Sequence, residues 1–166
     1  MTNPLIVTPT TSDPSTLFQV LCRSCEVYRD KCAYIYRAGD QEIKVSFAKL
    51  FEDVLLLARA FNRKGVAAGD RIMFLSDNRY SWIVSDLAIM SLGAIGVPRG
   101  SDTPSRELAY IVENSSCCHL VVETQELFEQ HRQNLKKVGG LKNIFIMTGP
   151  AIHSLFGKTY TYQDLL

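Results

Sequence analysis

Cysteine and histidine are the residue types in this chain whose spacing could support metal chemistry. Cys22 and Cys25 form the single C-x-x-C pair, without a second pair or a histidine at zinc-finger spacing. A structural zinc ion needs four ligands, so this pair alone does not make a site. We expect both thiols to lie on one face of a helix as small apolar core residues.

Two further cysteines and a histidine stand in a row at residues 117–119. The run is typical of a strand, in which neighbouring side chains point to opposite faces, so the three cannot easily chelate one ion. We expect Cys117, Cys118 and His119 to pack in the core, and the sequence predicts no metal ligand.

Nucleotide chemistry would require a glycine-rich loop whose backbone N–H groups meet phosphate at a helix N-terminus. Gly157, Lys158 and Thr159 imitate the end of such a loop, but Ile152 stands where its first glycine belongs. The sequence also lacks a G-x-G-x-x-G, a serine nucleophile elbow and an H-E-x-x-H. We therefore assign no catalytic residue and no cofactor to this chain.

Three side chains near expected strand ends, Arg79, Trp82 and Arg99, are candidates for contact with a ligand or with another domain. Arg99 follows a buried strand, where an arginine is costly unless it is paired. The alternative for Arg99 is an ion pair with Asp102 or a neighbouring loop. Trp82 could line a substrate tunnel, and its alternative is core packing from a helix face. Asp86, on an otherwise apolar helix, is expected to be a buried polar group with satisfied hydrogen bonds.

The elements that would position these side chains begin with a helix over residues 17–28, where apolar residues recur at helical spacing. Two alternating runs within residues 32–47 flank Gly39 and Asp40, which predicts a β-hairpin. From Ser46 onward, apolar residues recur three and four apart until Gly65, the clearest helical pattern in the sequence.

Beyond residue 70 the pattern alternates between strands and helices. Strands are expected over 71–76, 95–98, 117–122 and 143–147, and helices over 80–92, 104–114 and 125–138. This alternation requires right-handed crossovers and a parallel sheet with helices on both faces. The fold class is therefore α/β: a mostly parallel sheet flanked by helices and preceded by an N-terminal helix and a β-hairpin. Ligands of such sheets bind at the carboxyl ends of the strands, here residues 77–79, 99–103, 123–124 and 148–150.

Local signals at the helix ends agree with this alternation. Asp77 or Asn78 can cap the helix over 80–92, and Thr103 stands before a proline at the first position of the next helix. Thr124 can cap the last of the three, and Gly139 can close it.

The end of the chain has the N-cap and the first turn of a helix that does not continue, at residues 161–166. We interpret this pattern as a sign that the 166 residues are a fragment of a longer protein.

Composition narrows the class of protein. The chain is 46% hydrophobic and 21% charged, which is ordinary for one globular domain. A net charge of +1 disfavours nucleic acid and anionic membranes as partners. Residues 1–16 lack the features of a signal peptide, and the most apolar stretch, 82–97, is too short and too interrupted to span a bilayer. We expect no transmembrane segment and a cytoplasmic location, with peripheral membrane association left open for a parent protein.

Three segments, in the right order, resemble the N-terminal region of the adenylate-forming superfamily. Residues 46–50 are similar to its first core motif, although Lys49 stands where glutamate is usual. Residues 65–82 resemble a passage that contains Gly-Asp-Arg, a strand and then Asn-Arg with an aromatic. Residues 92–102 resemble the second core motif, and their Val-Pro-Arg-Gly is similar to the bacterial long-chain branch. The resemblance covers about residues 17–147.

The resemblance implies that the chain is the N-terminal fragment of an AMP-forming acyl-CoA synthetase, most like a bacterial long-chain fatty acid–CoA ligase. Members of this family adenylate a carboxylate with ATP and Mg²⁺ and then transfer the acyl group to coenzyme A. Their phosphate loop, acidic Mg²⁺-binding residues and C-terminal lysine lie downstream of the matching segments. The resemblance therefore implies ATP, Mg²⁺ and coenzyme A for the parent and an inactive fragment here.

The domain organisation expected from this resemblance has three parts: a flexible N-terminus at 1–16, the first part of the AMP-binding domain at 17–150, and a tail at 151–166 that starts a further helix. The remainder of the parent would be the main partner, and a fatty acid its substrate. An uncovered apolar face would let the isolated chain self-associate. The alternatives are a stand-alone, non-catalytic interaction module derived from this fold, an acyl-carrier-protein synthetase fragment, and a nucleotide-binding domain of another type.

Overall fold

The computed structural model of the chain describes residues 15–149 and 157–165. Its first elements are the helix α1 (Leu17–Val27) and a hairpin of β1 (Cys32–Ala38) and β2 (Gln41–Ser46). The hairpin turns at Gly39, whose φ of 61° lies in the left-handed region that glycine adopts without strain. The helix and the hairpin expected from the sequence are both confirmed.

The helix α2 (Phe47–Arg63) begins directly after the hairpin. The Ser46 hydroxyl accepts a hydrogen bond from the Lys49 backbone N–H at 3.2 Å, which satisfies one of the unpaired donors of the first turn. The apolar face of α2 is buried, and the Phe61 ring lies 4.6 Å from the Phe145 ring, centroid to centroid. This contact anchors α2 against the sheet.

Five parallel strands form the sheet in the order β4-β3-β5-β6-β7. The strands are β3 (Arg71–Leu75), β4 (Ile95–Arg99), β5 (His119–Thr124), β6 (Asn143–Thr148) and β7 (Lys158–Thr161), and the remaining helices are α3 (Tyr80–Ser91), α4 (Ser105–Asn114), α5 (Gln125–Val138) and α6 (Tyr162–Leu165). The four parallel strands expected from the sequence are confirmed. The sequence did not predict β7, which pairs with β6 at the edge of the sheet.

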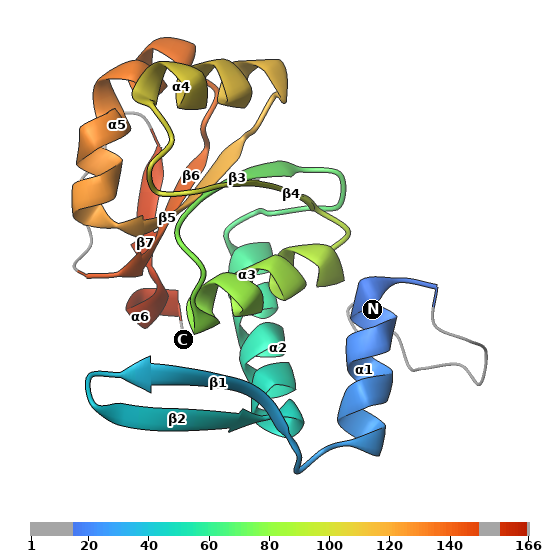
Figure 1. Cartoon of the computed structure of the whole chain (residues 1–166). Coiled ribbons are helices and arrows are strands. Elements are labelled where there is room, and N and C mark those ends of the chain that lie inside the picture. The colour runs from blue at the N-terminus through green and yellow to red at the C-terminus, as the bar shows by residue number, and fades with distance from the viewer. Residues whose placement is uncertain (1–14, 150–156, 166) are drawn as a thin grey trace.

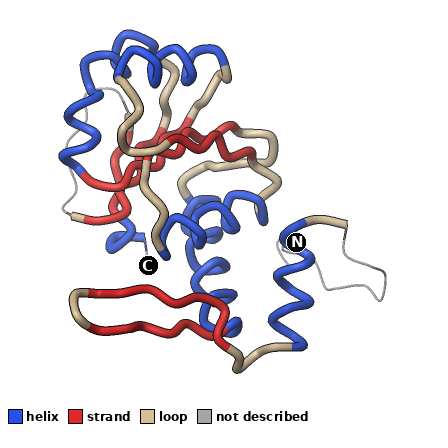
Figure 2. The backbone as a smooth tube through the Cα atoms, in the orientation of Figure 1, coloured by secondary structure: helices blue, strands red, loops and turns tan. Residues whose placement is uncertain are grey.

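Helices cover both faces of the sheet, as Figure 1 shows. Ile72 and Phe74 of β3 face one way and pack with α2 and α3, whereas Met73 and Leu75 face the other way and pack with α4 and α5. This alternation follows from the two-residue period of a strand. The hairpin and α1 lie beyond α2 and α3, away from the sheet (Figure 2).

Two of the expected helix caps are wrong. The N-cap of α3 is Arg79, without a side-chain cap, because the Asp77 carboxylate instead accepts a hydrogen bond from the Ser101 hydroxyl. The N-cap of α4 is Pro104, one position later than expected, and the Thr103 hydroxyl donates to the Gly100 carbonyl.

The caps of α5 and α6 are confirmed. Thr124 accepts a hydrogen bond from the Leu127 N–H at 3.2 Å, and Gly139 ends α5 with a φ of 71°. Thr161 and Asp164 exchange hydrogen bonds at the start of α6. Tyr162 is buried, so this short segment packs against the core. Residues 1–14 and 150–156, on which the expected N-terminus and the expected boundary at 150 fall, lie outside the described residues.

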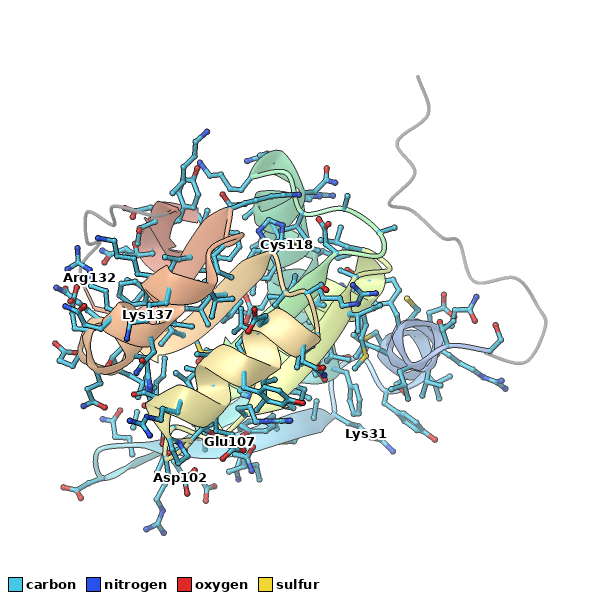
Figure 3. The ribbon with its side chains drawn as sticks, turned by 90° about the horizontal axis from the view of Figure 1, so that it is seen from above. Lys31, Asp102, Glu107, Cys118, Arg132 and Lys137 are labelled. Atoms are coloured by element: carbon cyan, nitrogen blue, oxygen red, sulfur yellow. The ribbon has the colours of Figure 1, made fainter. Side chains whose placement is uncertain are left out.

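The charged side chains labelled in Figure 3 come from several elements of the chain. Lys31 lies at the opposite side of the view from Arg132 and Lys137 (Figure 3). Across the described residues, every helix falls short of the length and apolar character needed to span a membrane.

Candidate functional site

The crevice between the carboxyl ends of β3 and β5 is the place where this topology would hold a ligand. Strand β4 follows β3 in the chain and pairs on one side of it, whereas β6 follows β5 and pairs on the opposite side of the sheet. Strand order therefore reverses between β3 and β5. In open parallel sheets, ligands bind at such a switch point.

Glu123, at the end of β5, occupies this crevice. Its Oε2 atom accepts a hydrogen bond from the Asp77 backbone N–H at 2.9 Å. The Ser76 hydroxyl lies 3.1 Å from the same oxygen and shares its proton with the Asp77 carbonyl at 2.8 Å. The Oε1 atom of Glu123 forms an ion pair with Nη2 of Arg79. The Glu123 side chain is only 15% exposed. A carboxylate of the chain thus lies where a ligand would bind. In the sequence, Glu123 was one of several residues at the expected strand ends and was not singled out.

Arg79, the first candidate residue, is therefore held by an internal ion pair. Its Nε atom is buried and has no hydrogen-bond partner among the described residues. Its other side lines an open hollow of about 480 Å³ between the hairpin and α3. That hollow is also lined by Tyr36, Arg37, Tyr80 and Ser81. The tyrosine rings of Tyr36 and Tyr80 stack there with their centroids 5.5 Å apart.

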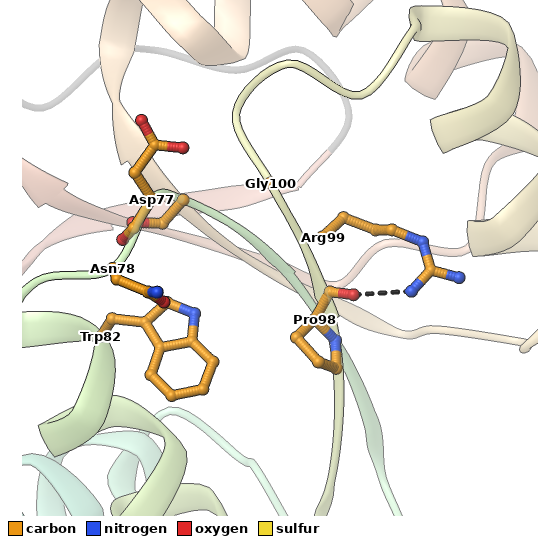
Figure 4. Close-up of a pocket in the computed structure, with 7 residues that line it drawn as sticks. Asp77, Asn78, Trp82, Pro98, Arg99 and Gly100 are labelled. Atoms are coloured by element: carbon orange, nitrogen blue, oxygen red, sulfur yellow. Dashed lines mark hydrogen bonds between the residues drawn. The ribbon is translucent and has the colours of Figure 1, made fainter.

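Trp82 and Arg99, the other two candidates, line a separate hollow of about 260 Å³ at the ends of β3 and β4 (Figure 4). Trp82 packs edge-on against Phe74, with 5.8 Å between the ring centroids. It therefore joins the core while one side faces the hollow. Trp82 and Arg99 thus line one hollow, whereas Arg79 lines the neighbouring hollow.

The Arg99 side chain turns away from Trp82 and back onto its own strand (Figure 4). Its Nη1 donates to the Pro98 carbonyl at 2.7 Å. The expected alternative, an ion pair with Asp102, is not formed. The reason is that β4 is an edge strand and the Arg99 side chain is exposed, so no desolvation cost requires a carboxylate partner.

Pro98 and Arg99 together protect the free edge of the sheet. Ile95 N–H donates to Asp70, and the Arg99 carbonyl accepts from Ser76, so the backbone groups of these two residues face β3. The backbone groups of Gly96 and Pro98 consequently face outward. Pro98 has no N–H to donate, and its carbonyl oxygen already accepts a hydrogen bond from the Arg99 side chain. Such features hinder the pairing of a further strand.

Asp86 is not the satisfied polar group that the sequence predicted. It is half-buried on α3 and has no hydrogen-bond partner among the described residues. A Cβ atom added to Gly96 would lie 3.2 Å from Asp86 Oδ1, so the carboxylate sits directly under the edge strand. Burial raises the pKa of Asp86 above its usual value.

The cysteines of α1 lie where they were expected. Cys22 and Cys25 are both buried on the face of α1 that packs against α2 and α3. Burial raises the pKa of Cys25 to about 11, so this thiol stays protonated and unreactive. Their assignment as apolar core residues is confirmed.

Cys118 and His119 come together with Asp70, an arrangement that the sequence did not predict. The potential ligand atoms of the three side chains lie within 4.8 Å of one another. Asn143 Nδ2 donates to the Lys64 carbonyl at 2.9 Å and to His119 Nδ1 at 3.0 Å. His119 must therefore carry its proton on Nε2, which donates to Asp70 Oδ2 at 3.3 Å. A metal ion would need the lone pair of that nitrogen, so the arrangement as it stands is a hydrogen-bonded network.

Solved structures that share this fold include a coronafacic acid ligase and a putative CoA ligase. Coronafacic acid ligase from Pectobacterium brasiliense superposes with a TM-score of 0.76 over 89% of this chain and 28% of its own length, at 18% identity. A putative long-chain-fatty-acid CoA ligase from Rhodopseudomonas palustris gives a TM-score of 0.74 over 90% of this chain and 36% of its own, at 22% identity. The fold is therefore that of the adenylate-forming enzymes.

The sequence identifies the family. The family model described as AMP-binding enzyme matches residues 21–163, and the chain belongs to this family. It is 30% identical over 126 residues to a chloroplastic long-chain-fatty-acid–acyl-carrier-protein ligase of Arabidopsis thaliana, covering 76% of this chain and 17% of that protein. It is 28% identical over 91 residues to a long-chain-fatty-acid–CoA ligase of Mycobacterium tuberculosis, covering 55% and 15%. The chain thus spans less than a fifth of the length of these relatives.

Proposed function

We propose that the chain is the N-terminal part of a ligase that activates a long-chain fatty acid with ATP and transfers it to coenzyme A. The family match over residues 21–163 carries this proposal, and the relative from M. tuberculosis supports coenzyme A as the acceptor. A cytoplasmic location of the parent is part of the same proposal. Within the parent, this part contributes a sheet and its covering helices.

The chain by itself forms no acyl-adenylate under this proposal. Attack of a carboxylate on ATP adds negative charge at the α-phosphate, which enzymes stabilise with Mg²⁺, cationic side chains and preorganised N–H donors. The crevice does not fit ATP phosphates, because Glu123 already binds the Asp77 N–H, the Ser76 hydroxyl and Arg79. The sequence supplies no phosphate loop elsewhere. Groups of a catalytic site act together, so we expect loss of activity to be near total.

Titration calorimetry of the chain with ATP and MgCl₂, together with a pyrophosphate-release assay on a long-chain fatty acid, tests this proposal. We expect no binding heat up to about 1 mM ATP, which corresponds to less than about 4 kcal/mol of binding free energy. Pyrophosphate release should equal that of the buffer. Micromolar ATP binding or measurable turnover would show that the active site lies in this part of the chain.

An acyl carrier protein is the second candidate acceptor, because the A. thaliana relative is a ligase for that acceptor. The two acceptors can be separated in the longest protein product that contains this chain. Acyl transfer to coenzyme A alone would support the first proposal, whereas transfer to the carrier protein alone would replace it.

A further inference from the structure

The crevice between β3 and β5 presents several hydrogen-bond donors to one point. The Asp77 backbone N–H, the Ser76 hydroxyl and the Arg79 guanidinium all meet the carboxylate of Glu123. These groups come from the end of β3 and the start of α3, and Glu123 comes from β5, 46 residues after Asp77. A cation, a hydroxyl and a backbone N–H in convergence are the donors that proteins use to bind oxyanions.

The carboxylate of Asp77 would repel an anion, but it is hydrogen-bonded to a residue outside the crevice. It is turned toward the next loop, where Oδ1 accepts from the Ser101 hydroxyl at 2.6 Å and from the Ser101 N–H at 3.3 Å. These bonds lower the pKa of Asp77 and keep its charge on that side. The crevice therefore receives the Asp77 N–H, while the Asp77 carboxylate is hydrogen-bonded to Ser101.

Arg79 keeps one donor that Glu123 does not use. The Nε atom of Arg79 is buried and has no hydrogen-bond partner among the described residues. A carboxylate has two oxygens, whereas a tetrahedral oxyanion has four. Ser76 and Asp77 also line the hollow of about 260 Å³, so this hollow lies next to the crevice.

We propose that this crevice is an oxyanion-binding site that Glu123 occupies as an intramolecular ligand, and that inorganic phosphate binds there once the carboxylate is removed. The rival explanation is a purely structural ion pair that ties β5 to the start of α3. The two differ in what they predict for a variant without the carboxylate. A structural ion pair leaves only a weaker fold, whereas an occupied site leaves an empty one that a free anion can fill.

The experiment compares the chain with its Glu123→Ala variant in phosphate and in chloride at matched ionic strength. We expect about 20 mM phosphate to raise the Tm of Glu123→Ala above its value in chloride, because a ligand that binds only the folded state stabilises it. Calorimetry should give a phosphate Kd at least about tenfold lower for this variant than for the unchanged chain.

Two further variants identify the source of the effect. Glu126→Ala removes an exposed carboxylate three residues away and makes the same change in net charge, so it should show no gain in phosphate response. Adding Arg79→Gln to Glu123→Ala should abolish the response, because the guanidinium is the cation of the site.

An equal phosphate response in Glu123→Ala and Glu126→Ala, or a response that survives Arg79→Gln, would overturn the proposal. If Glu123→Ala does not fold in chloride, the proposal requires that phosphate restores its far-UV circular dichroism. Failure of phosphate to do so would count as decisively against the site as a flat calorimetric titration.

Discussion

Asp86 places a carboxylate under the edge strand β4 without a hydrogen-bond partner among residues 15–149 and 157–165. Burial alone raises its pKa above the ordinary value of 3.8. The folded state therefore holds this proton more tightly than the unfolded state does. The stability that this group contributes is fully present below the unfolded-state pKa and is lost as pH rises through the folded-state pKa.

We expect Asp86→Asn to raise the unfolding free energy at pH 7 by about 1 kcal/mol, because the amide removes a half-buried charge. For a chain of this size, that corresponds to a Tm increase of about 2–4 °C. Thermal denaturation at pH 7 and near pH 3.5 measures the effect. The gain should shrink at the lower pH, because protonation of the carboxyl group, whose pKa is raised by burial, removes its charge.

Asp102→Asn is the matched control, since Asp102 is exposed on the loop after β4. Its effect should stay within about 0.5 kcal/mol at both pH values. Should the two variants behave alike at pH 7, Asp86 would have to be a solvated surface charge.

The start of α2 shows how an element tolerates a residue that departs from its family motif. Lys49 stands at N3, where a glutamate would complete a capping box with Ser46. Its Nζ atom instead contacts Asp53 Oδ1 at 2.8 Å and Glu52 Oε2 at 3.4 Å. Asp53 Oδ2 also accepts from the Tyr80 hydroxyl at 2.8 Å, which joins α2 to α3. The lysine thus supports a contact between two helices.

We expect Lys49→Glu, which restores the motif, to lower the unfolding free energy by about 0.7–1.5 kcal/mol. A capping box contributes about 0.5 kcal/mol here, but the change loses two exposed ion pairs and adds repulsion with Glu52 and Asp53, each about 0.3–0.5 kcal/mol. Urea unfolding measures the difference. Lys49→Gln can complete the box without a charge, so its stability should lie near that of the unchanged chain.

Salt provides the second comparison for this helix. At about 1 M NaCl the gap between Lys49→Glu and Lys49→Gln should shrink, because charge repulsion at the surface is screened. A gap that does not respond to salt would mean that packing, and not charge, decides the residue at N3.

The whole molecule leaves one side of α1 uncovered within the described residues. Leu17, Val20 and Val27 of this helix are 65%, 45% and 61% exposed, while its other face packs against α2 and α3. Large apolar side chains on one helix face are typical of an interaction surface. In the proposed parent, residues beyond this chain would cover that face.

We expect the isolated chain to self-associate through α1, with a mass above that of the monomer in light scattering at about 100 μM. Val20→Lys combined with Val27→Lys should return it to a monomer, because burying two charges in the contact is costly. Tyr110→Lys is the control, since Tyr110 is 64% exposed on α4, across the sheet from α1. A monodisperse monomer of the chain without substitutions would contradict the expectation and favour a stand-alone module.

The sequence by itself determined the family of this protein and the elements of the described residues other than β7. The hydrophobic period and the Thr124 and Gly139 signals predicted α5 with the bounds that the structure shows, Gln125–Val138. The motifs at 46–50, 65–82 and 92–102 indicated the family to which the chain belongs. These features are local: the period of a helix, a cap or a turn depends on residues a few positions apart.

Only the tertiary structure decided which side chains meet. The order of the strands puts Glu123 beside Asp77 and Arg79, pairs β7 with β6, and leaves Asp86 without a partner under Gly96. Contacts of this kind join residues far apart in the chain, and they depend on strand order and on which helix covers which face. Periodicity carries no information about strand order or helix placement. The occupation of the crevice between β3 and β5 by Glu123 therefore could not be predicted from the sequence.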